Sequence, residues 1–389
     1  MSKINKILSF SLLAPVPFLA FLFSVNIGVK KDYVEINSKT LKELTFPYYY
    51  GTDTTLPSDF PYMINLETIS KKNNNIKKFI VHGDIINTPI FIPLGSDFEL
   101  SGDSTARILS SGDYDINYGI IIGTLTPNDQ EEKTTNVKIH NLSISTSNDG
   151  GYGNNGIFIQ QCTNVEIYNN QISTSQSAYC KCIDTENVSY LNIHDNILTS
   201  NGVGGAAISC YETKKMNIEN NLIQNFTSSG NIISLGDIEE GTIKNNFLSS
   251  VASSYRSSLI DFSDNSSFNI TNNIFNSSSS YPTDLRTPFC RVFLIEDDAL
   301  IDFLDSKDNV AVSDISQDIN NDSFTPSFGS YKKVEENIDI KLFSSFDSSF
   351  IYQFCYFDSF KNIFGKKINE LGLKISNSYT NQIIAKIVS

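Results

Sequence analysis

Hydrophobic and polar residues alternate along short stretches of this chain, and the stretches return at a nearly constant spacing. Between residues 139 and 275, variants of the phrase Ile-x-Asn-Asn-x-Ile occur six times, and the first isoleucine returns every 25 to 28 residues. These isoleucines are Ile139, Ile167, Ile193, Ile218, Ile243 and Ile270. A period of this length predicts one short unit stacked on copies of itself rather than a mixed globular core.

Within each repeat the hydrophobic residues are two positions apart, as in Val165 with Ile167 and Leu191 with Ile193. That spacing predicts β-strands with one face on a core. Ten residues earlier in each repeat lies a second pair of columns, formed by Ile157, Ile183, Ile208, Ile233 and Ile260, and by Ile159, Thr185, Cys210, Leu235 and Phe262. Each coil is therefore expected to hold at least two strands, with like residues stacked on like.

An asparagine column follows the first isoleucine of each repeat by three residues. Its members are Asn170, Asn196, Asn221, Asn246 and Asn273, and Leu142 takes the place in the first repeat. Asparagine tolerates left-handed backbone conformations, and its amide both donates and accepts hydrogen bonds. The column predicts a ladder that holds sharp turns; the alternative is a set of ligands for a sugar or an ion.

These phrases and aliphatic columns resemble the right-handed parallel β-helix repeats of the pectin-lyase-like superfamily. The resemblance covers residues 135–276 and extends to about 80 and 300 through Phe79-Ile-Val-His-Gly-Asp84, Phe98-Glu-Leu-Ser-Gly-Asp103 and Arg291-Val-Phe-Leu-Ile295. It implies an all-β coil of three short sheets, and very often work on polysaccharides outside the cytoplasm. The superfamily also includes non-catalytic adhesins and structural proteins, so the function does not follow from the fold.

The chain is expected to form one solenoid with flanking segments. Residues 1–29 combine Lys3 and Lys6 with an apolar run at 7–29, which predicts an export signal; an uncleaved membrane anchor is the alternative, because the run nearly spans a bilayer. Residues 30–78 are expected to be a linker and N-terminal cap, 79–300 the parallel β-helix, and 301–389 a C-terminal cap or small appended domain with a short helix near 361–373. The protein is therefore expected to be secreted or at the cell surface, with membrane contact only through its N-terminal segment.

The net charge of -14 argues against nucleic acid and anionic membranes as partners. A polyanionic substrate would need Ca²⁺ or a local cationic groove, and calcium bridges are common among the pectate lyases that the chain resembles, so Ca²⁺ is the candidate cofactor. No residue set predicts a protein-bound metal. The six cysteines leave disulfides open in an exported protein, although Cys210 occupies a core column typical of a small buried hydrophobe.

Residues between the inward columns should point outward. The two outward columns are Phe158, Asp184, Ser209, Ser234 and Asp261, and Gln160, Glu186, Tyr211, Gly236 and Ser263. Because neighbouring coils lie about 4.8 Å apart, Asp184, Glu186, Ser209 and Tyr211 should form one compact patch. We assign catalysis to the two carboxylates, which a glycosidase requires as a pair, and sugar binding to Ser209, Tyr211 and Asp261.

His194 lies in another outward column, with Tyr168, Glu219 and Lys244, and is a further substrate-binding candidate and general base. For both columns the alternative is an ordinary solvated face, because alternating charges also prevent repulsion down a stack. The polygalacturonase-like combination of Asn-Thr-Asp, Asp-Asp and Gly-His-Gly is absent. The sequence therefore predicts a protein that binds a carbohydrate polymer along its lateral face, with polysaccharide hydrolase or lyase activity, non-catalytic adhesion and a structural envelope role as the competing hypotheses.

Overall fold

A computed structural model describes residues 31–39, 45–46, 63–95, 97–111, 116–124, 134–148, 153–226, 230–252, 257–264, 266–279, 290–296, 300–313, 331–332 and 340–344. The chain divides into two compact units, Met1–Asp32 and Tyr33–Ser389, and every described strand belongs to the second unit. The predicted export segment and the predicted C-terminal helix lie outside the described residues.

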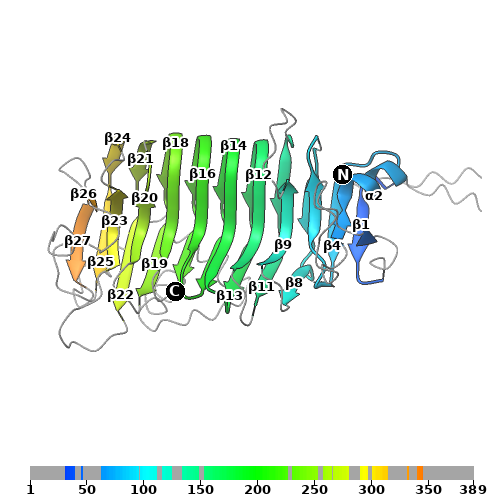
Figure 1. The fold of residues 1–389 in the computed structure, drawn as a ribbon, viewed down its shortest axis with the longest axis horizontal. Coiled ribbons are helices and arrows are strands. Elements are labelled where there is room, and N and C mark those ends of the chain that lie inside the picture. The colour runs from blue at the N-terminus through cyan, green and yellow to red at the C-terminus, as the bar shows by residue number, and fades with distance from the viewer. Residues whose placement is uncertain are drawn as a thin grey trace, which may run out of the picture. The chain divides into compact units, whose positions relative to one another are not determined.

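Parallel strands stacked side by side make the second unit a parallel β-solenoid, as Figure 1 shows. One sheet has ten strands: β5 (Asp84–Ile86), β8 (Arg107–Ser111), β11 (Ser143–Ser147), β13 (Gln171–Ser175), β15 (Ile197–Asn201), β17 (Leu222–Asn225), β19 (Phe247–Ala252), β22 (Ile274–Ser279), β25 (Asn309–Ser313) and β27 (Ile340–Ser344). These strands pair in parallel, each with the equivalent strand of the next turn.

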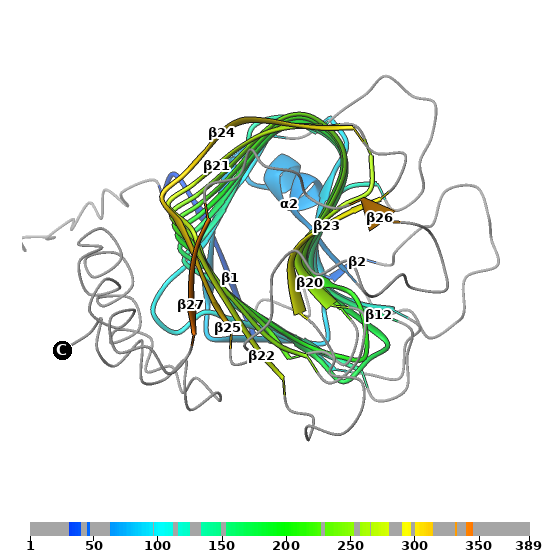
Figure 2. The same cartoon turned by 90° about the vertical axis from the view of Figure 1, so that its left-hand side faces the viewer.

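The second sheet has seventeen strands. They are β1 (Val34–Asn37), β2 (Thr45–Phe46), β3 (Met63–Asn65), β4 (Lys78–His82), β6 (Ile90–Pro93), β7 (Glu99–Gly102), β9 (Ile116–Gly123), β10 (Val137–His140), β12 (Gly153–Tyr168), β14 (Tyr179–His194), β16 (Ala206–Glu219), β18 (Asn231–Lys244), β20 (Ser257–Phe262), β21 (Ser266–Thr271), β23 (Cys290–Glu296), β24 (Ile301–Lys307) and β26 (Tyr331–Lys332). Two short pairings, β2 with β3 and β23 with β26, are antiparallel. Viewed along the stack, successive turns superpose into one closed outline (Figure 2).

The predicted register is confirmed across the central turns. Ile157 pairs with Ile183, which pairs with Ile208, and the column continues to Ile233 and Ile260. All of these side chains are buried in one continuous apolar core. The alternation of inward and outward residues in the sequence thus specifies the stacking, because a shift by one residue would turn every isoleucine to solvent.

The central turns differ from the prediction in how their strands divide. The two predicted strands of each repeat are one long strand, such as the sixteen-residue β12 and β14, bent near its middle. The bend falls on a residue with positive φ: Gln161 (57°), Asn187 (54°) and Glu212 (51°) in consecutive turns. Each bend directs the strand to a second face of the solenoid while the hydrogen bonding to its neighbours continues on both sides.

The asparagine column is a buried ladder that holds the turn after each long strand. Asn221 donates from its backbone to Asn246 Oδ1 at 2.9 Å, and its own Oδ1 accepts from the backbone of Asn196 at 2.9 Å. The ladder begins at Leu142, whose backbone N–H binds Asn170, and runs on to Asn309. Full burial excludes these amides as ligands for a sugar or ion and confirms their structural role.

The left-handed conformation that we assigned to the ladder asparagines falls instead on the residue before each one. Asn169, Asp195, Asn220 and Asn245 have φ between 55° and 57°, whereas Asn221 and the other ladder members do not have positive φ. The two adjacent polar residues of each phrase therefore have different roles. The first one makes the tight turn, and the second one pairs its amide with the next coil.

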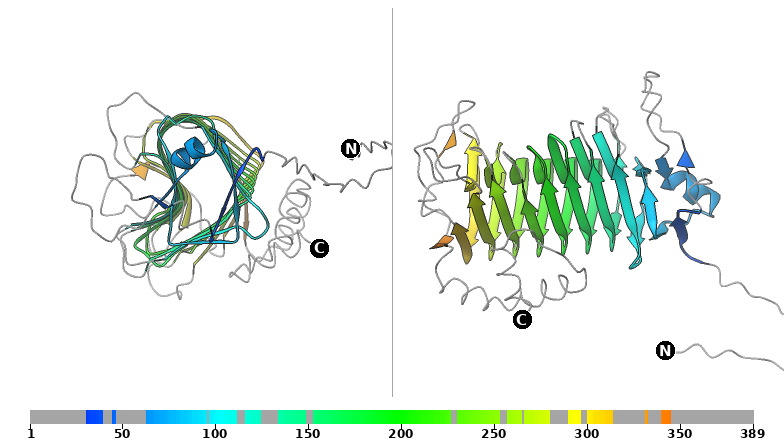
Figure 3. Two further views of the ribbon diagram at one scale, coloured as in Figure 1. Left: turned by 90° about the vertical axis from the view of Figure 1, so that its right-hand side faces the viewer. Right: turned by 90° about the horizontal axis from the view of Figure 1, so that it is seen from below.

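Parallel pairing extends past both bounds predicted for the solenoid, residues 79 and 300. At one end β1 pairs with β4, and helix α2 (Leu66–Lys72) lies at this end of the stack (Figure 3). The helix buries Leu66 and Ile69 in the common core. At the other end β25 pairs with β27. The sequence does not predict this extension, because the outer strands alternate over only a few residues and lack the Ile-x-Asn-Asn-x-Ile phrase.

Candidate functional site

The long strands β12, β14, β16 and β18 place the predicted outward residues beside one another in consecutive turns. Asp184 pairs with Ser209 and Glu186 pairs with Tyr211 across β14 and β16. Tyr211 in turn pairs with Gly236 of β18. The predicted pairs are therefore confirmed, because the register of the core isoleucines also determines which outward residues lie side by side.

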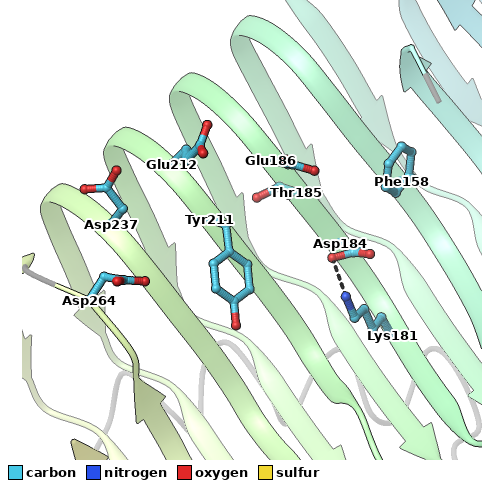
Figure 4. A pocket seen from close by; sticks show the side chains of 9 residues that line it. All are labelled: Phe158, Lys181, Asp184, Thr185, Glu186, Tyr211, Glu212, Asp237 and Asp264. Carbon is cyan, nitrogen blue, oxygen red and sulfur yellow. Dashed lines mark hydrogen bonds and ion pairs between the residues drawn. The ribbon is translucent and has the colours of Figure 1, made fainter. Parts of the chain in front are cut away.

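A pocket of about 480 Å³ opens on this face (Figure 4). Its lining consists of Phe158, Lys181, Asp184, Thr185, Glu186, Tyr211, Glu212, Asp237 and Asp264. Both predicted catalytic carboxylates and Tyr211, a predicted sugar-binding residue, thus belong to one concave surface. Concave sites with a few placed polar groups and aromatic walls are the usual form of a ligand site.

Fixed donors hold the two predicted catalytic carboxylates in place. Lys181 Nζ donates to Asp184 Oδ1 at 2.9 Å, and the Asp184 side chain is only 14% exposed. Gln160 Nε2 donates to Glu186 Oε2 at 3.0 Å, from a side chain that is itself buried. Each carboxylate is therefore oriented before any ligand arrives, which lowers the ordering cost of binding.

The ring of Tyr211 lies flat along the pocket wall, because the next turn carries a glycine at the facing position. A Cβ placed on Gly236 would lie 2.6 Å from ring atoms of Tyr211, so no other residue leaves room for the ring there. The hydroxyl of Tyr211 reaches Ser234 Oγ at 3.2 Å. Gly236 and Ser234 thus fix the ring along the stack, while 36% of Tyr211 remains exposed.

Two predicted binding residues share the column of Asp184 but do not line the pocket. Ser209 is buried, with 2% exposure. Asp261 is half-buried, and its Oδ2 accepts a hydrogen bond from Asn231 Nδ2 at 2.9 Å. Of this outward column, only Phe158 and Asp184 reach the pocket.

His194 lies beyond the bend at Asn187, on a different face from the pocket. Its ring stacks on Tyr168 with 5.1 Å between centroids and an interplanar angle of 1°. Tyr168 stacks in turn on His140 at 4.6 Å. The ring nitrogens of His194 contact Asp195 at 2.8 Å and Glu166 at 3.3 Å. With its ring stacked and both nitrogens engaged, His194 belongs to a ladder on this second face and does not join the carboxylates.

The ladder perturbs its histidines in opposite directions. The hydrogen bond to Asp195 raises the pKa of His194, and Glu166 adds to the effect despite partial burial. Burial lowers the pKa of His140, and the nearby Glu99 only partly offsets it. Burial alone would raise the pKa of Glu166, but hydrogen bonds from Lys138 and His194 bring it below its ordinary value.

Three acidic residues of the pocket were not among the predicted site residues: Glu212, Asp237 and Asp264. Glu212 and Asp237 occupy the bend, where φ is 51° and 54°. Strict alternation would turn a residue beside Tyr211 inward, but the bend brings it to the pocket rim instead. The signal that could have found them was the column itself, since polar residues hold the bend position in consecutive turns.

The candidate cofactor Ca²⁺ was considered against the acidic, histidine and cysteine side chains of the described residues. No three His, Cys, Asp or Glu side chains among them converge closely enough to hold a metal. Calcium takes six to eight oxygen ligands, whereas the pocket carboxylates are spread over successive turns. The described cysteines Cys162, Cys180, Cys182 and Cys210 are buried, and no disulfide joins any two of them.

Comparisons of the chain with protein-family models, with curated proteins and with solved structures return no match. Within the described residues the single helix α2 has seven residues, and no helix there is long and apolar enough to cross a membrane. The residues predicted as an anchor, 7–29, lie outside that part. The use of the pocket therefore has to be inferred from its own geometry.

Proposed function

We propose that this protein binds a carbohydrate polymer along the lateral face of its solenoid, with Tyr211 as the stacking platform. The observation that carries the proposal is the ring of Tyr211, held along the stack by Gly236 and Ser234 yet still exposed in a pocket. An aromatic ring offers a rigid apolar surface at low entropic cost, which suits the apolar face of a sugar ring.

Asp184 and Glu186 supply the polar half of such a site. Carboxylate oxygens accept hydrogen bonds from sugar hydroxyls, and both groups are already oriented by Lys181 and Gln160. Because a glycosidase uses two carboxyl groups, these residues are also our candidate pair for cleavage of the bound polymer. The competing functions are non-catalytic adhesion and a structural role in a cell envelope.

The cellular setting and the ancestry belong to the same proposal. Lys3 and Lys6 before the apolar run support export, to the medium or to the cell surface. The parallel stack and its asparagine ladder support kinship with the pectin-lyase-like superfamily, including a right-handed coil with capped ends. N-terminal sequencing of the protein from fractionated cells would test export, since a chain recovered intact from the cytoplasm contradicts it.

Binding is tested by titrating the full chain with a panel of neutral, acidic and amino-sugar polysaccharides, with and without Ca²⁺. Tyr211→Ala should weaken binding at least tenfold, because it removes the platform. Tyr190→Ala is the matched control, since Tyr190 is 57% exposed and lies outside the pocket. The proposal fails if no glycan binds, or if the two alanine variants behave alike.

Cleavage is tested in the same samples by measuring new reducing or unsaturated ends. Product formation that is lost in Asp184→Asn and Glu186→Gln, with binding retained, identifies an enzyme and its carboxylates. Binding without products identifies an adhesin or scaffold. Both variants keep the size of the side chain, so their folding should match the wild type.

A further inference from the structure

The pocket that we propose for a glycan carries a large excess of negative charge. Its lining includes five carboxylates and one ammonium group, and the carboxylates are those of Asp184, Glu186, Glu212, Asp237 and Asp264. The ammonium group, Lys181, is already paired with Asp184 at 2.9 Å. Its lining residues therefore offer no second cation to receive an anionic sugar, while several negative groups face the pocket.

Three of these carboxylates form a row along one rim of the pocket, from consecutive turns (Figure 4). Glu212 and Asp237 hold equivalent bend positions in β16 and β18, and Asp264 follows β20 in the next turn. Neighbouring turns lie about 4.8 Å apart, a distance at which stacked like charges repel. The row therefore gathers three negative charges along the stack, which a cationic ligand would offset.

The fold does not require acidic residues in this row. In the two preceding turns the same bend position is filled by Gln161 and Asn187, with φ of 57° and 54°. Neutral amides therefore serve the bend as well as carboxylates do. The change from amide to acid occurs where the bend residues begin to line the pocket, at Glu212 and Asp237.

The row also lacks compensation from basic side chains within the described part of the chain. None of the salt bridges described there involves Glu212, Asp237 or Asp264, and the nearby Lys215 pairs with Glu240 at 2.9 Å. Asp264 accepts a hydroxyl hydrogen bond from Ser263 at 3.2 Å. Within the described residues, no ion pair therefore neutralises the charge of the rim.

We propose that the pocket selects a polysaccharide that carries free amino groups, such as a polymer of deacetylated amino sugars, and rejects polyuronates. This inference rests on the glycan-binding function proposed above and names its substrate class. The polymer would follow the stack, with a sugar ring on Tyr211 and its ammonium groups beside the rim carboxylates. The spacing fits, because one sugar residue of an extended chain is close in length to the distance between neighbouring turns, about 4.8 Å.

The test is calorimetric titration of the full chain with three oligosaccharides of equal length, built from glucosamine, N-acetylglucosamine and galacturonate. The glucosamine oligomer should bind at least tenfold more tightly than the N-acetylated one, and this advantage should shrink as salt is raised. The galacturonate oligomer should not bind. The double variant Glu212→Gln/Asp237→Asn should lose most of the advantage, and its folding should be preserved because neighbouring turns already use these amides.

A matched control removes two exposed charges outside the pocket lining, as in Glu239→Gln/Asp302→Asn, and should leave the advantage intact. Equal affinity for the amino and N-acetylated oligomers, or an unchanged advantage in Glu212→Gln/Asp237→Asn, overturns the charge selection while the glycan-binding proposal stands. Absence of binding by every oligosaccharide overturns both proposals. Binding of galacturonate that appears only with Ca²⁺ and is lost in the double variant overturns the inference in favour of a calcium bridge.

Discussion

Replacement of Asn221 by alanine should destabilise the solenoid by about 3 kcal/mol. The side chain is fully buried, and its Oδ1 accepts from the backbone N–H and Nδ2 of Asn196 at 2.9 and 3.1 Å. Its Nδ2 donates to the carbonyls of Ile193 and Glu219 at 2.8 and 2.9 Å. Alanine would strand the Asn196 N–H, at about 1–3 kcal/mol, and remove further hydrogen bonds worth about 0.5–1.5 kcal/mol each.

Asn221→Asp should be worse than alanine. Aspartate would place a carboxylate oxygen where the amide now donates to two carbonyl oxygens, in a site without solvent. A buried charge without a partner costs more than a missing hydrogen bond. The order of stability should therefore be wild type, then alanine, then aspartate, and this order separates loss of the ladder from a simple loss of side-chain volume.

Urea unfolding followed by circular dichroism measures these differences, with thermal melting as a second readout. Asn217→Ala is the control, because Asn217 lies in the same turn on the outward side of β16 and should change stability by no more than about 0.5 kcal/mol. Since a repeat protein can unfold in stages, the slope of each transition must be compared as well. A loss below about 1 kcal/mol for Asn221→Ala would refute the ladder as a source of stability.

Burial and charge support three further predictions. Ile233→Asp should cost more than about 4 kcal/mol and unfold the central turns, since it buries an unpaired carboxylate; an unchanged melting temperature would contradict the register. In an NMR titration, His194 should change protonation above pH 6.5 and His140 below it. The contribution of His194 to stability is therefore lost as pH rises through its raised pKa, and that of His140 is lost as pH falls below 6.5. Reversed midpoints would exclude the described ladder. Burial raises the pKa of Cys182 and Cys210 to about 12, so a thiol reagent should label both only after unfolding, as peptide mass spectrometry would show.

The fold was predictable because the repeated phrase determines how the strands of neighbouring turns align. Each Ile-x-Asn-Asn-x-Ile phrase fixes an inward isoleucine, and a column of equivalent residues then fixes every outward neighbour by alternation. This is why the pairing of Asp184 with Ser209 and of Glu186 with Tyr211 could be written down from the sequence. Asn309 was missed because it continues the ladder without the surrounding phrase, after 36 residues instead of the usual spacing.

The pocket was only half predictable, because alternation fails at a bend. Glu212 and Asp237 follow the outward column by one residue, so a strict period of two hides them from the site. The same bend separates His194 from Asp184 and Glu186, although all three lie on the one strand β14. Columns of equivalent residues in the sequence predict which residues are neighbours along the stack. The angle between two faces depends instead on the positive-φ residue at the bend. Its polar side chain does not distinguish the bend from an ordinary turn.

The position of the acidic residues at the pocket rim is more informative than the net charge of the chain. A net charge of -14 taken alone indicates only a protein that avoids anionic partners. At the bend, however, the change from Gln161 and Asn187 to Glu212 and Asp237 brings charge into the pocket without any demand from the backbone. We propose that the carboxylates beside the exposed tyrosine, at a position where the same fold also accepts amides, serve ligand binding rather than stability. Under that proposal, a ligand recognises the charge at the bend rather than the solenoid itself.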